Sequence, residues 1–221
     1  MDFTFLSRTP LFRGILPEEI ESMLSCLNAV EKHYKRGEVI YYAGDVIRSL
    51  GIVLSGRVSV ESDDVWGNRN ILSHVGPGHV FAETYACIPG ETLMVHVVAV
   101  EDSTILFLDA EQIFETCQTA CGYHNKLIRN MMFIFAQKNL NLSRKIFHTS
   151  PKSIRGRVLS FLSEQATRSG SNSFTIQFNR QQLADYLNVD RSSLSNELGK
   201  MQADGFIQVE KNHFTLLDKD Q

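Results

Sequence analysis

The side chains with the clearest chemical potential lie between residues 179 and 207, which read NRQQLADYLNVDRSSLSNELGKMQADGFI. The apolar spacing predicts two short helices, one from about Arg180 to Leu187 and one that begins after Asp190. The second helix has a buried stripe of Leu194, Leu198 and Met201, and its other face carries Arg, Ser and Asn with hardly any acid. In the major groove Arg pairs with guanine and Asn with adenine, so this face is typical of a DNA-reading helix. The candidate DNA-contacting residues are Arg180, Gln181, Arg191, Ser192, Ser193, Ser195, Asn196 and Lys200.

The residues around these two helices also fit a winged helix-turn-helix. Asn188 stands at the sharp turn, where a left-handed backbone is required, and Asp190 can cap the second helix. Gly205 ends that helix, and FIQVE and HFTLL form a hairpin across Lys211-Asn212 that supplies the wing. The alternative is a helical pair that only packs, because such units exist without DNA. The buried spacing, the polar face and the hairpin together favour binding to double-stranded DNA.

A long helix is predicted over residues 110–149, and it carries a second kind of pattern. Apolar residues recur there at spacings of four and three, with one polar member that would fix the register of a two-stranded coil. This predicted dimer seam consists of Ile128, Met132, Phe135, Asn139, Leu142 and Ile146. Met131, Phe133 and Ile134 widen the apolar surface, so part of the helix is also expected against the N-terminal domain. The sequence therefore predicts a homodimer, and a purely intramolecular helix is the alternative.

The elements before this helix are mostly β-strands. A short helix is expected over residues 16–29, followed from about 30 to 109 by β-prone runs cut by turns such as Gly44-Asp45 and Trp66-Gly67-Asn68. This rhythm predicts a jelly-roll β-roll, so the fold class is α+β. Ser150-Pro151 ends the long helix and marks a hinge. The predicted domains are 1–109, an effector-sensing β-roll with its N-terminal helix, 110–149, the dimerisation helix, and 150–221, the DNA-binding domain.

Composition limits the class of protein further. The 221 residues carry a net charge of −3, which is unevenly distributed along the chain. Residues 1–143 are acidic, with 11 Lys and Arg against 17 Asp and Glu, and residues 144–221 are basic, with 11 against 8. No run approaches the roughly 20 apolar residues of a membrane helix. The first residues do not resemble a signal peptide, so a cytoplasmic protein without a membrane partner is expected. The four cysteines form no disulfide framework.

These features resemble those of the cyclic-AMP receptor protein/FNR family of bacterial transcription regulators. The resemblance rests on YKRGEVIYYAGD, LGIVLSGRVSVES and WGNRNILSHVGPGHVFAE, with turn glycines Gly44, Gly56 and Gly67, and on PKSIRGRVLSFL at the start of the DNA-binding domain. It covers nearly the whole chain. It implies a homodimer that binds two DNA half-sites, contacts RNA polymerase and responds to a small effector.

The sequence departs from the family pattern at positions that bind the ligand and at positions that contact DNA. Members that bind cyclic AMP have a Gly-Glu pair, followed about ten residues later by Arg and Ser or Thr. Here the pair is Ala82-Glu83, and Leu93-Met94 replace the residues that would neutralise the cyclic phosphate. The effector is therefore expected to differ from cyclic AMP. Family members often carry Glu and Arg where this chain has Ser192 and Asn196, whereas Arg191 matches, so the preferred half-site should also differ.

An apolar pocket for an apolar or aromatic effector is predicted instead. Its lining residues would be Phe81, Ala82, Glu83, Leu93, Met94 and Met131. A filled core that binds nothing is the alternative. Haem ligated by His96 or His124 is another possible sensor, whereas an iron–sulfur centre would need clustered N-terminal cysteines and only Cys26 lies there. Cys117 and Cys121, at i and i+4 on a helix, could form a metal or redox pair, but burial is the more common role of such a pair.

Two rival classes of protein remain. Jelly rolls also build cupin metalloenzymes, and GPGHVFAE is superficially cupin-like. A cupin needs three His and usually a Glu on one metal, yet no His-x-His occurs here. We therefore expect no catalytic residues, no metal site and no enzyme activity. The third class, a structural dimer, would show no salt-dependent DNA binding.

Overall fold

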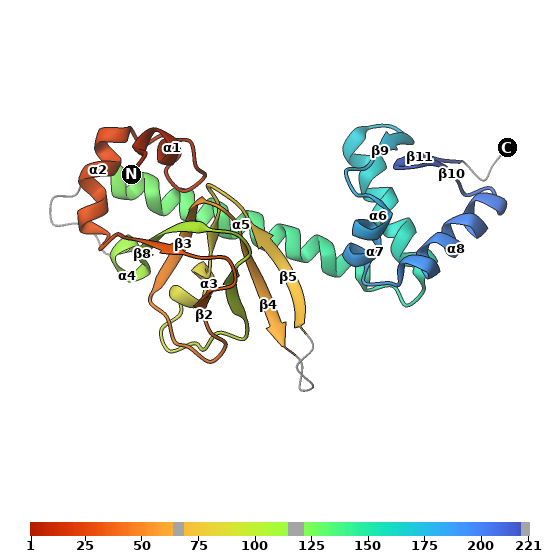
Figure 1. Cartoon of the computed structure of the whole chain (residues 1–221). Coiled ribbons are helices and arrows are strands. Elements are labelled where there is room, and N and C mark those ends of the chain that lie inside the picture. The colour runs from red at the N-terminus through yellow and green to blue at the C-terminus, as the bar shows by residue number, and fades with distance from the viewer. Residues whose placement is uncertain (64–68, 115–121, 218–221) are drawn as a thin grey trace. The chain divides into compact units, whose positions relative to one another are not determined.

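The computed structural model describes residues 1–63, 69–114 and 122–217 (Figure 1). Tertiary contacts divide the chain into two units, Met1–Phe135 and Ala136–Gln221, and the helix α5 (Gly122–Thr149) contributes to both. We call them the β-roll unit and the DNA-binding unit. The predicted turn Trp66-Gly67-Asn68, with the family glycine Gly67, and the pair Cys117 and Cys121 lie outside the described residues.

The β-roll unit contains two four-stranded antiparallel sheets, ordered β1-β8-β3-β6 and β2-β7-β4-β5. The first sheet comprises β1 (Val30–Tyr34), β3 (Ser49–Ser55), β6 (Val80–Phe81) and β8 (Ser103–Asp109). The second comprises β2 (Val39–Tyr41), β4 (Val58–Asp63), β5 (Arg69–Val75) and β7 (His96–Ala99). The β-roll unit also contains the short helices α1 (Phe3–Ser7), α2 (Pro17–Cys26), α3 (Glu83–Ala86) and α4 (Ala110–Phe114).

The central strand β8 shows why the first sheet is buried on both faces. Its central residues, Ile105–Leu108, are apolar without interruption, as expected of a strand covered on both sides. Ile105 and Phe107 point into the space between the sheets, where they pack with residues of both sheets. Leu106 and Leu108 point the other way, into a cluster formed with α1, α2, α4 and α5. This sheet is therefore a wall between two separate apolar clusters.

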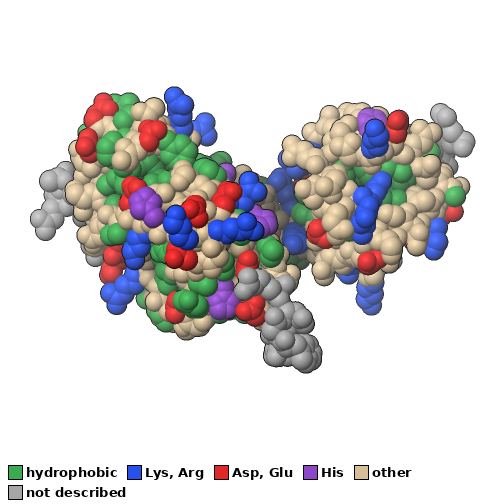
Figure 2. Space-filling view, in the orientation of Figure 1, with side chains coloured by type: hydrophobic (Ala, Val, Ile, Leu, Met, Phe, Trp, Pro, Cys, Tyr) green, Lys and Arg blue, Asp and Glu red, His purple; other side chains and the backbone are tan. Residues whose placement is uncertain are grey.

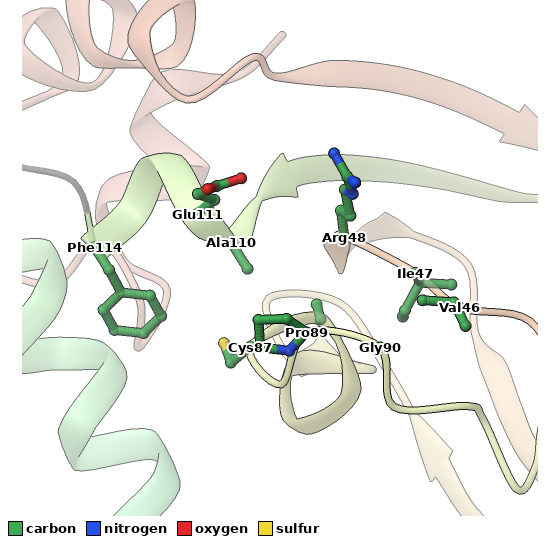
Figure 3. A pocket seen from close by; sticks show the side chains of 10 residues that line it. Val46, Ile47, Arg48, Cys87, Pro89, Gly90, Ala110, Glu111 and Phe114 are labelled. Atoms are coloured by element: carbon green, nitrogen blue, oxygen red, sulfur yellow. The ribbon is translucent and has the colours of Figure 1, made fainter.

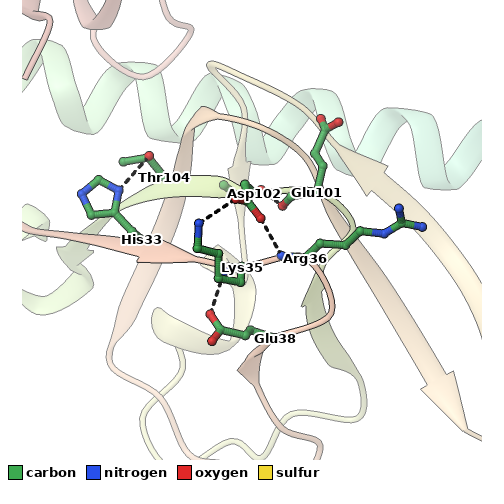
Figure 4. Close-up of polar contacts among 8 residues, drawn as sticks. His33, Lys35, Arg36, Glu38, Glu101, Asp102 and Thr104 are labelled. Atoms are coloured by element: carbon green, nitrogen blue, oxygen red, sulfur yellow. Dashed lines mark hydrogen bonds and ion pairs between the residues drawn. The ribbon is translucent and has the colours of Figure 1, made fainter.

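The turn between β1 and β2 is fastened to the turn before β8 (Figure 4). The Lys35 ammonium lies 2.8 Å from a carboxylate oxygen of Asp102, and the Arg36 backbone N–H donates to the other oxygen at 3.0 Å. These hydrogen bonds lower the pKa of Asp102. Acidic and basic side chains are interspersed over the visible face of this unit (Figure 2). The charged side chains near Asp102 therefore form local ion pairs and hydrogen bonds rather than one surface of a single charge.

The DNA-binding unit combines three helices with a small sheet. Its elements are α6 (Ile154–Ser169), α7 (Arg180–Leu187), α8 (Arg191–Ala203), β9 (Ser173–Thr175), β10 (Ile207–Glu210) and β11 (His213–Leu216). The strands pair antiparallel in the order β10-β11-β9. Val158, Phe161 and Leu162 of α6 pack with the apolar faces of α7 and α8 and with Phe214 of β11. The predicted jelly roll and winged helix-turn-helix are thus both confirmed.

Several element boundaries differ from the expected ones. The helix expected over 16–29 covers only Pro17–Cys26, and α1 is not evident from the sequence because it has only five residues. Within 110–149 the structure has two helices, α4 and α5, separated by undescribed residues. The end of α5 at Thr149, just before Ser150-Pro151, agrees with the prediction.

Candidate DNA-binding and effector sites

The turn between α7 and α8 is built by three local devices. Asn179 caps α7 by accepting from the backbone of Gln182, whose side chain accepts in return from the Asn179 N–H. Asn188 has the left-handed backbone expected at this turn, with φ 54°. Arg157 of α6 donates from Nη1 to the carbonyls of Leu187 and Asn188, at 3.2 and 2.9 Å. The angle between α7 and α8 is therefore held by specific contacts.

Asp190 fixes the beginning of α8, as predicted. One carboxylate oxygen accepts from the backbone N–H groups of Ser192 and Ser193, each at 2.9 Å, and from the Ser192 hydroxyl at 2.5 Å. These hydrogen bonds, with that of the Ser192 hydroxyl the largest, lower the pKa of Asp190. The free N–H groups of the first turn are thus satisfied, and the Ser192 hydroxyl is already engaged.

The exposed face of α8 carries most of the predicted DNA-contacting residues. Arg191, Ser195, Asn196 and Lys200 are exposed, and none of their side chains has a partner among the described residues. Leu194, Leu198 and Met201 are buried on the opposite face. Ser193 is half-buried, so its contribution to the cap is more evident than any contact outside the protein. The structure thus presents a polar helix face with unsatisfied donors.

Arg180 and Gln181 on α7 are in a different situation from the residues of α8. Arg180 is half-buried: its guanidinium lies over the Phe214 ring, 5.9 Å from the centroid, and donates to the Lys211 carbonyl at 3.2 Å. Burial lowers the pKa of this side chain. Gln181 donates from Nε2 to Asp185 at 2.8 Å. The structure shows Arg180 in a role that the sequence did not indicate, attachment of the wing to α7.

The wing itself is a two-residue hairpin, as predicted. Glu210 pairs with His213, and Lys211 takes a positive φ of 55° at the turn. Asn212 donates from Nδ2 to the Ile176 carbonyl at 3.0 Å, which ties the turn to the chain after β9. The exposed Lys211 is therefore a further cation beside α7 that the site prediction omitted.

Arg155 joins α6 to α8 in a way that the sequence analysis missed. Its Nε lies 2.6 Å from Glu197, its Nη2 lies 2.7 Å from Asp204, and its guanidinium stacks over the Phe206 ring at 5.3 Å. The acid on α8 is thus neutralised from within the unit. Glu197, an acid on a helix expected to face DNA, was the available signal that an internal cation must pair with it.

The residues expected to bind an effector are spread over separate parts of the β-roll unit. Phe81 is 2% exposed, and its ring packs against Gly51 so closely that a Cβ there would lie 2.2 Å from a ring carbon. Tyr41 packs edge-on against Phe81 and Phe107, with centroids 6.4 and 5.7 Å away. Side chains therefore fill this part of the roll.

The other predicted effector residues are also separated. Met131 is fully buried in the cluster on the helical side of the first sheet, so the sheet itself separates it from Phe81. Leu93 is buried, whereas Met94 is 77% exposed. Ala82 has a left-handed backbone with φ 60°, and Glu83 is buried at the start of α3. Their roles in effector binding remain predictions.

A different hollow opens at the far end of α3 (Figure 3). Its volume is about 690 Å³, and it is lined by Val46, Ile47, Arg48, Ala86, Cys87, Pro89, Gly90, Ala110, Glu111 and Phe114. The Arg48 and Glu111 side chains point away from Pro89 (Figure 3). Burial raises the pKa of the Cys87 thiol to about 11, so it is neutral at pH 7. The lining thus combines an apolar part around Cys87 and Pro89 with two charged side chains, Arg48 and Glu111.

The predicted dimer seam lies along α5 with most of its members exposed. Met132, Leu142 and Ile146 are between 56 and 60% exposed, and Asn139 is also exposed. Ile128 and Phe135 are half-buried, and Phe135 packs against the cluster on the helical side of the sheet. Met131 and Ile134 are buried there, as expected, but Phe133 is 62% exposed.

The two candidate haem ligands already have polar neighbours. His96 accepts from the Ala43 N–H at Nδ1, and its Nε2 lies 3.6 Å from Asp63. Nε2 of the buried His124 lies 3.2 Å from the Gln112 carbonyl. Across residues 1–63, 69–114 and 122–217, no three His, Cys, Asp or Glu side chains converge as metal ligands would. None of the helices in these ranges has the length and apolarity needed to span a membrane.

Comparisons with known proteins agree with this architecture. Residues 31–120 match the cyclic nucleotide-binding domain, and residues 156–221 match the Crp-like helix-turn-helix domain. The chain is 26% identical over 201 residues to the cyclic AMP receptor protein of Thermus thermophilus, with 91% of this chain and 89% of the relative covered. It is 22% identical over 221 residues to a CRP-like cAMP-activated global transcriptional regulator of Mycobacterium tuberculosis, with 98% and 96% covered.

A solved structure gives the same result. The Thermus thermophilus catabolite activator protein is 25% identical and has a TM-score of 0.53, with 94% of this chain and 93% of that chain covered. The β-roll and the Crp-like helix-turn-helix lie in the same chain, which is the architecture of a Crp/Fnr-type transcription regulator. The chain belongs to the Crp/Fnr family.

Proposed function

We propose that this regulator is a homodimer that reads two DNA half-sites with α8. The observation that carries this proposal is the exposed, unpaired row of Arg191, Ser195, Asn196 and Lys200 on a helix whose other face is buried. Side chains of these types bind base edges and phosphates in the major groove. RNA polymerase is the further partner that the family resemblance implies for this function.

The seam on α5 supports the dimer. Met132, Leu142 and Ile146 leave a large apolar surface exposed on a single helix, with Asn139 in the same row. Burying this row against a second copy would remove apolar surface from water at about 25 cal/mol per Å². A two-fold dimer then places two α8 helices on half-sites about one helical turn of DNA, roughly 34 Å, or a multiple of it apart.

Selection from a random double-stranded DNA library tests this function. We expect the purified protein to enrich sequences with two inverted half-sites at one fixed spacing. We also expect affinity for the enriched sequence to fall steeply with salt, because phosphate contacts release counterions. Recovery of no common sequence, or of single half-sites only, would contradict a dimeric reader.

We further propose that a small effector other than cyclic AMP controls DNA binding. The Thermus thermophilus and Mycobacterium tuberculosis relatives are named for cyclic AMP. In this chain, however, Leu93 is buried and apolar and Met94 is 77% exposed, so neither could pair with a cyclic phosphate. The hollow beside α3 is the site that we assign to an apolar or aromatic effector. Its volume lies within the range of about 300–1,000 Å³ typical of small-molecule sites, and Ile47, Pro89 and Phe114 supply apolar lining.

Thermal unfolding with nucleotide tests the exclusion of cyclic AMP. A ligand that binds only the folded state at about 100 times its Kd adds about 2.7 kcal/mol to stability, which raises the melting temperature measurably. We expect millimolar cyclic AMP to change neither the melting temperature nor the DNA affinity. The double variant Leu93→Arg, Met94→Ser is the matched comparison, because it restores the charge partner at the same positions. A clear shift in the unmodified protein would sink this part of the proposal.

A further inference from the structure

Three arginines gather where the N-terminal segment meets α5 in the β-roll unit. Arg8, Arg13 and Arg129 line one surface hollow of about 810 Å³, and its other lining residues are Ser7, Pro10, Asn130 and Phe133. We propose that this hollow is a binding site for a small organic anion. The ligand class is a phosphate, or a comparable oxyanion, attached to an aromatic group.

The charge at this hollow is unbalanced within the protein. The three arginine side chains are exposed, and no guanidinium among them has an ion pair or hydrogen bond in the described parts of the chain. This is not a result of composition, because residues 1–143 are acidic, with 17 Asp and Glu against 11 Lys and Arg. Neighbouring like charges repel one another, so a bound anion would relieve the repulsion. The planar guanidinium also matches phosphate oxygens with two parallel donors.

The backbone that carries Arg8 and Arg13 is held firmly in place. Leu11 and Phe12, between the two arginines, are fully buried in the cluster on the helical side of the sheet. Asn130 of α5 donates from Nδ2 to the carbonyls of Leu11 and Arg13, both at 2.9 Å. Lys126 donates to the Gly14 carbonyl at 2.9 Å. Both anchoring residues are on the helix that carries Arg129, so the three arginines are mounted on one rigid framework, which lowers the entropic cost of binding.

Phe133 indicates the apolar part of the ligand. Its ring is 62% exposed, although the buried members of α5 on either side of it, Met131 and Ile134, are almost fully covered. It follows Arg129 by four residues, so the ring and the guanidinium lie on the same face of the helix. A flat group attached to an anion held by Arg129 could therefore stack on this ring.

This site borders the proposed dimer seam but shares none of its residues. Successive residues of an α-helix are rotated by about 100°, so Phe133 lies about 140° from Ile128 and about 100° from Met132, while Arg129 lies next to Met132 at the edge of the seam. The hollow also has the size typical of a small-molecule site, whereas acidic protein segments bind extended surfaces. We therefore assign a small ligand rather than an acidic partner protein.

Isothermal titration of the full-length protein with phenyl phosphate and with inorganic phosphate, at constant ionic strength, tests the site. We expect saturable binding of both probes, with phenyl phosphate binding more tightly. The variant Arg8→Gln, Arg13→Gln, Arg129→Gln should weaken both at least tenfold. The matched control removes three exposed cations elsewhere in the same unit, Lys32→Gln, Arg36→Gln, Arg57→Gln, and should leave both affinities unchanged.

Two further variants make the test specific. Phe133→Leu should remove the advantage of phenyl phosphate and leave inorganic phosphate unaffected. Arg129→Gln alone should weaken both probes at least threefold, and it replaces the triple variant if that protein does not fold. Absence of saturable binding to the unmodified protein, or an equal loss in the control, would overturn the site. Tighter binding of a hexaglutamate peptide than of phenyl phosphate would overturn the assignment to a small ligand.

Discussion

The Nε2 atom of His148 lies 2.9 Å from a carboxylate oxygen of Glu164, while Nδ1 lies 2.9 Å from the Tyr186 hydroxyl. His148 is 1% exposed, so the last turn of α5, α6 and α7 meet at one buried imidazole. Arg144 holds the other oxygen of Glu164 at 3.0 Å. Burial is the main reason that the pKa of His148 is lowered; the charge of Arg144 acts in the same direction, and Glu164 opposes both.

This lowered pKa predicts a loss of stability in acid. The unfolded chain takes up a proton at the ordinary imidazole value of 6.5, whereas the folded chain resists it, so the free energy of unfolding falls as the pH drops below that value. We expect the melting temperature to fall between about pH 7.5 and about pH 5.5, and His148→Gln to flatten this dependence. The control is His213→Gln, which removes an exposed imidazole from the same unit. An unchanged pH dependence in His148→Gln would show that other groups dominate.

Ala82 predicts a stabilising substitution. It has φ 60° and ψ 9° immediately before α3, a left-handed conformation that costs an L-residue roughly 1–2 kcal/mol. Glycine avoids this cost but has more freedom in the unfolded chain, so Ala82→Gly should raise stability by about 0.5–1 kcal/mol. Ala86→Gly, at the last residue of α3, should instead lower stability, because Ala86 packs against the cluster on the helical side of the first sheet. The measurement is urea unfolding of the unmodified protein and of the two variants. A lower free energy of unfolding in Ala82→Gly would contradict backbone strain at this residue.

The dimer seam can now be tested with less risk to the fold than a change at Phe135, which packs partly inside its own unit. Leu142 is 60% exposed, so Leu142→Asp should leave the protomer folded but place two carboxylates in the seam. We expect sedimentation to show monomers and operator binding to be lost. Leu140→Asp is the matched control, because Leu140 is 46% exposed but lies on another face of α5. A dimer that persists in Leu142→Asp would move the interface elsewhere.

Local chemistry could be read from the sequence, while long-range packing could not. Asn188 and Asp190 take the turn and cap conformations that their side chains favour, so the helix-turn-helix was predictable to the residue. The two sides of β8 appeared as one apolar run, and only the sheet topology shows which residues face which cluster. The sequence alone likewise could not show that Met131 and Phe81 belong to different clusters.

The polar contacts that hold the DNA-binding unit together escaped prediction for a similar reason. Arg180, expected at the DNA, lies over the ring of Phe214, which is 34 residues further along the chain on β11. The partners of His148 and Arg155 are likewise distant in sequence. Such contacts depend on how closely and at what angle two helices pack. The periodicity of a single sequence does not reveal that geometry.

The most direct test of the central claim is the effect of Arg191→Ala on binding to the selected operator and to single-base variants of it. If α8 reads bases, removing an exposed guanidinium from its first turn should cost about 1–3 kcal/mol on the operator and abolish discrimination at one base pair in each half-site. Lys200→Ala, which removes an exposed cation about two and a half turns further along α8, should weaken binding to all sequences alike and reduce the salt slope. We expect Arg191→Ala to lose specificity at one position. An equal loss of affinity for every sequence, with all base preferences kept, would contradict it.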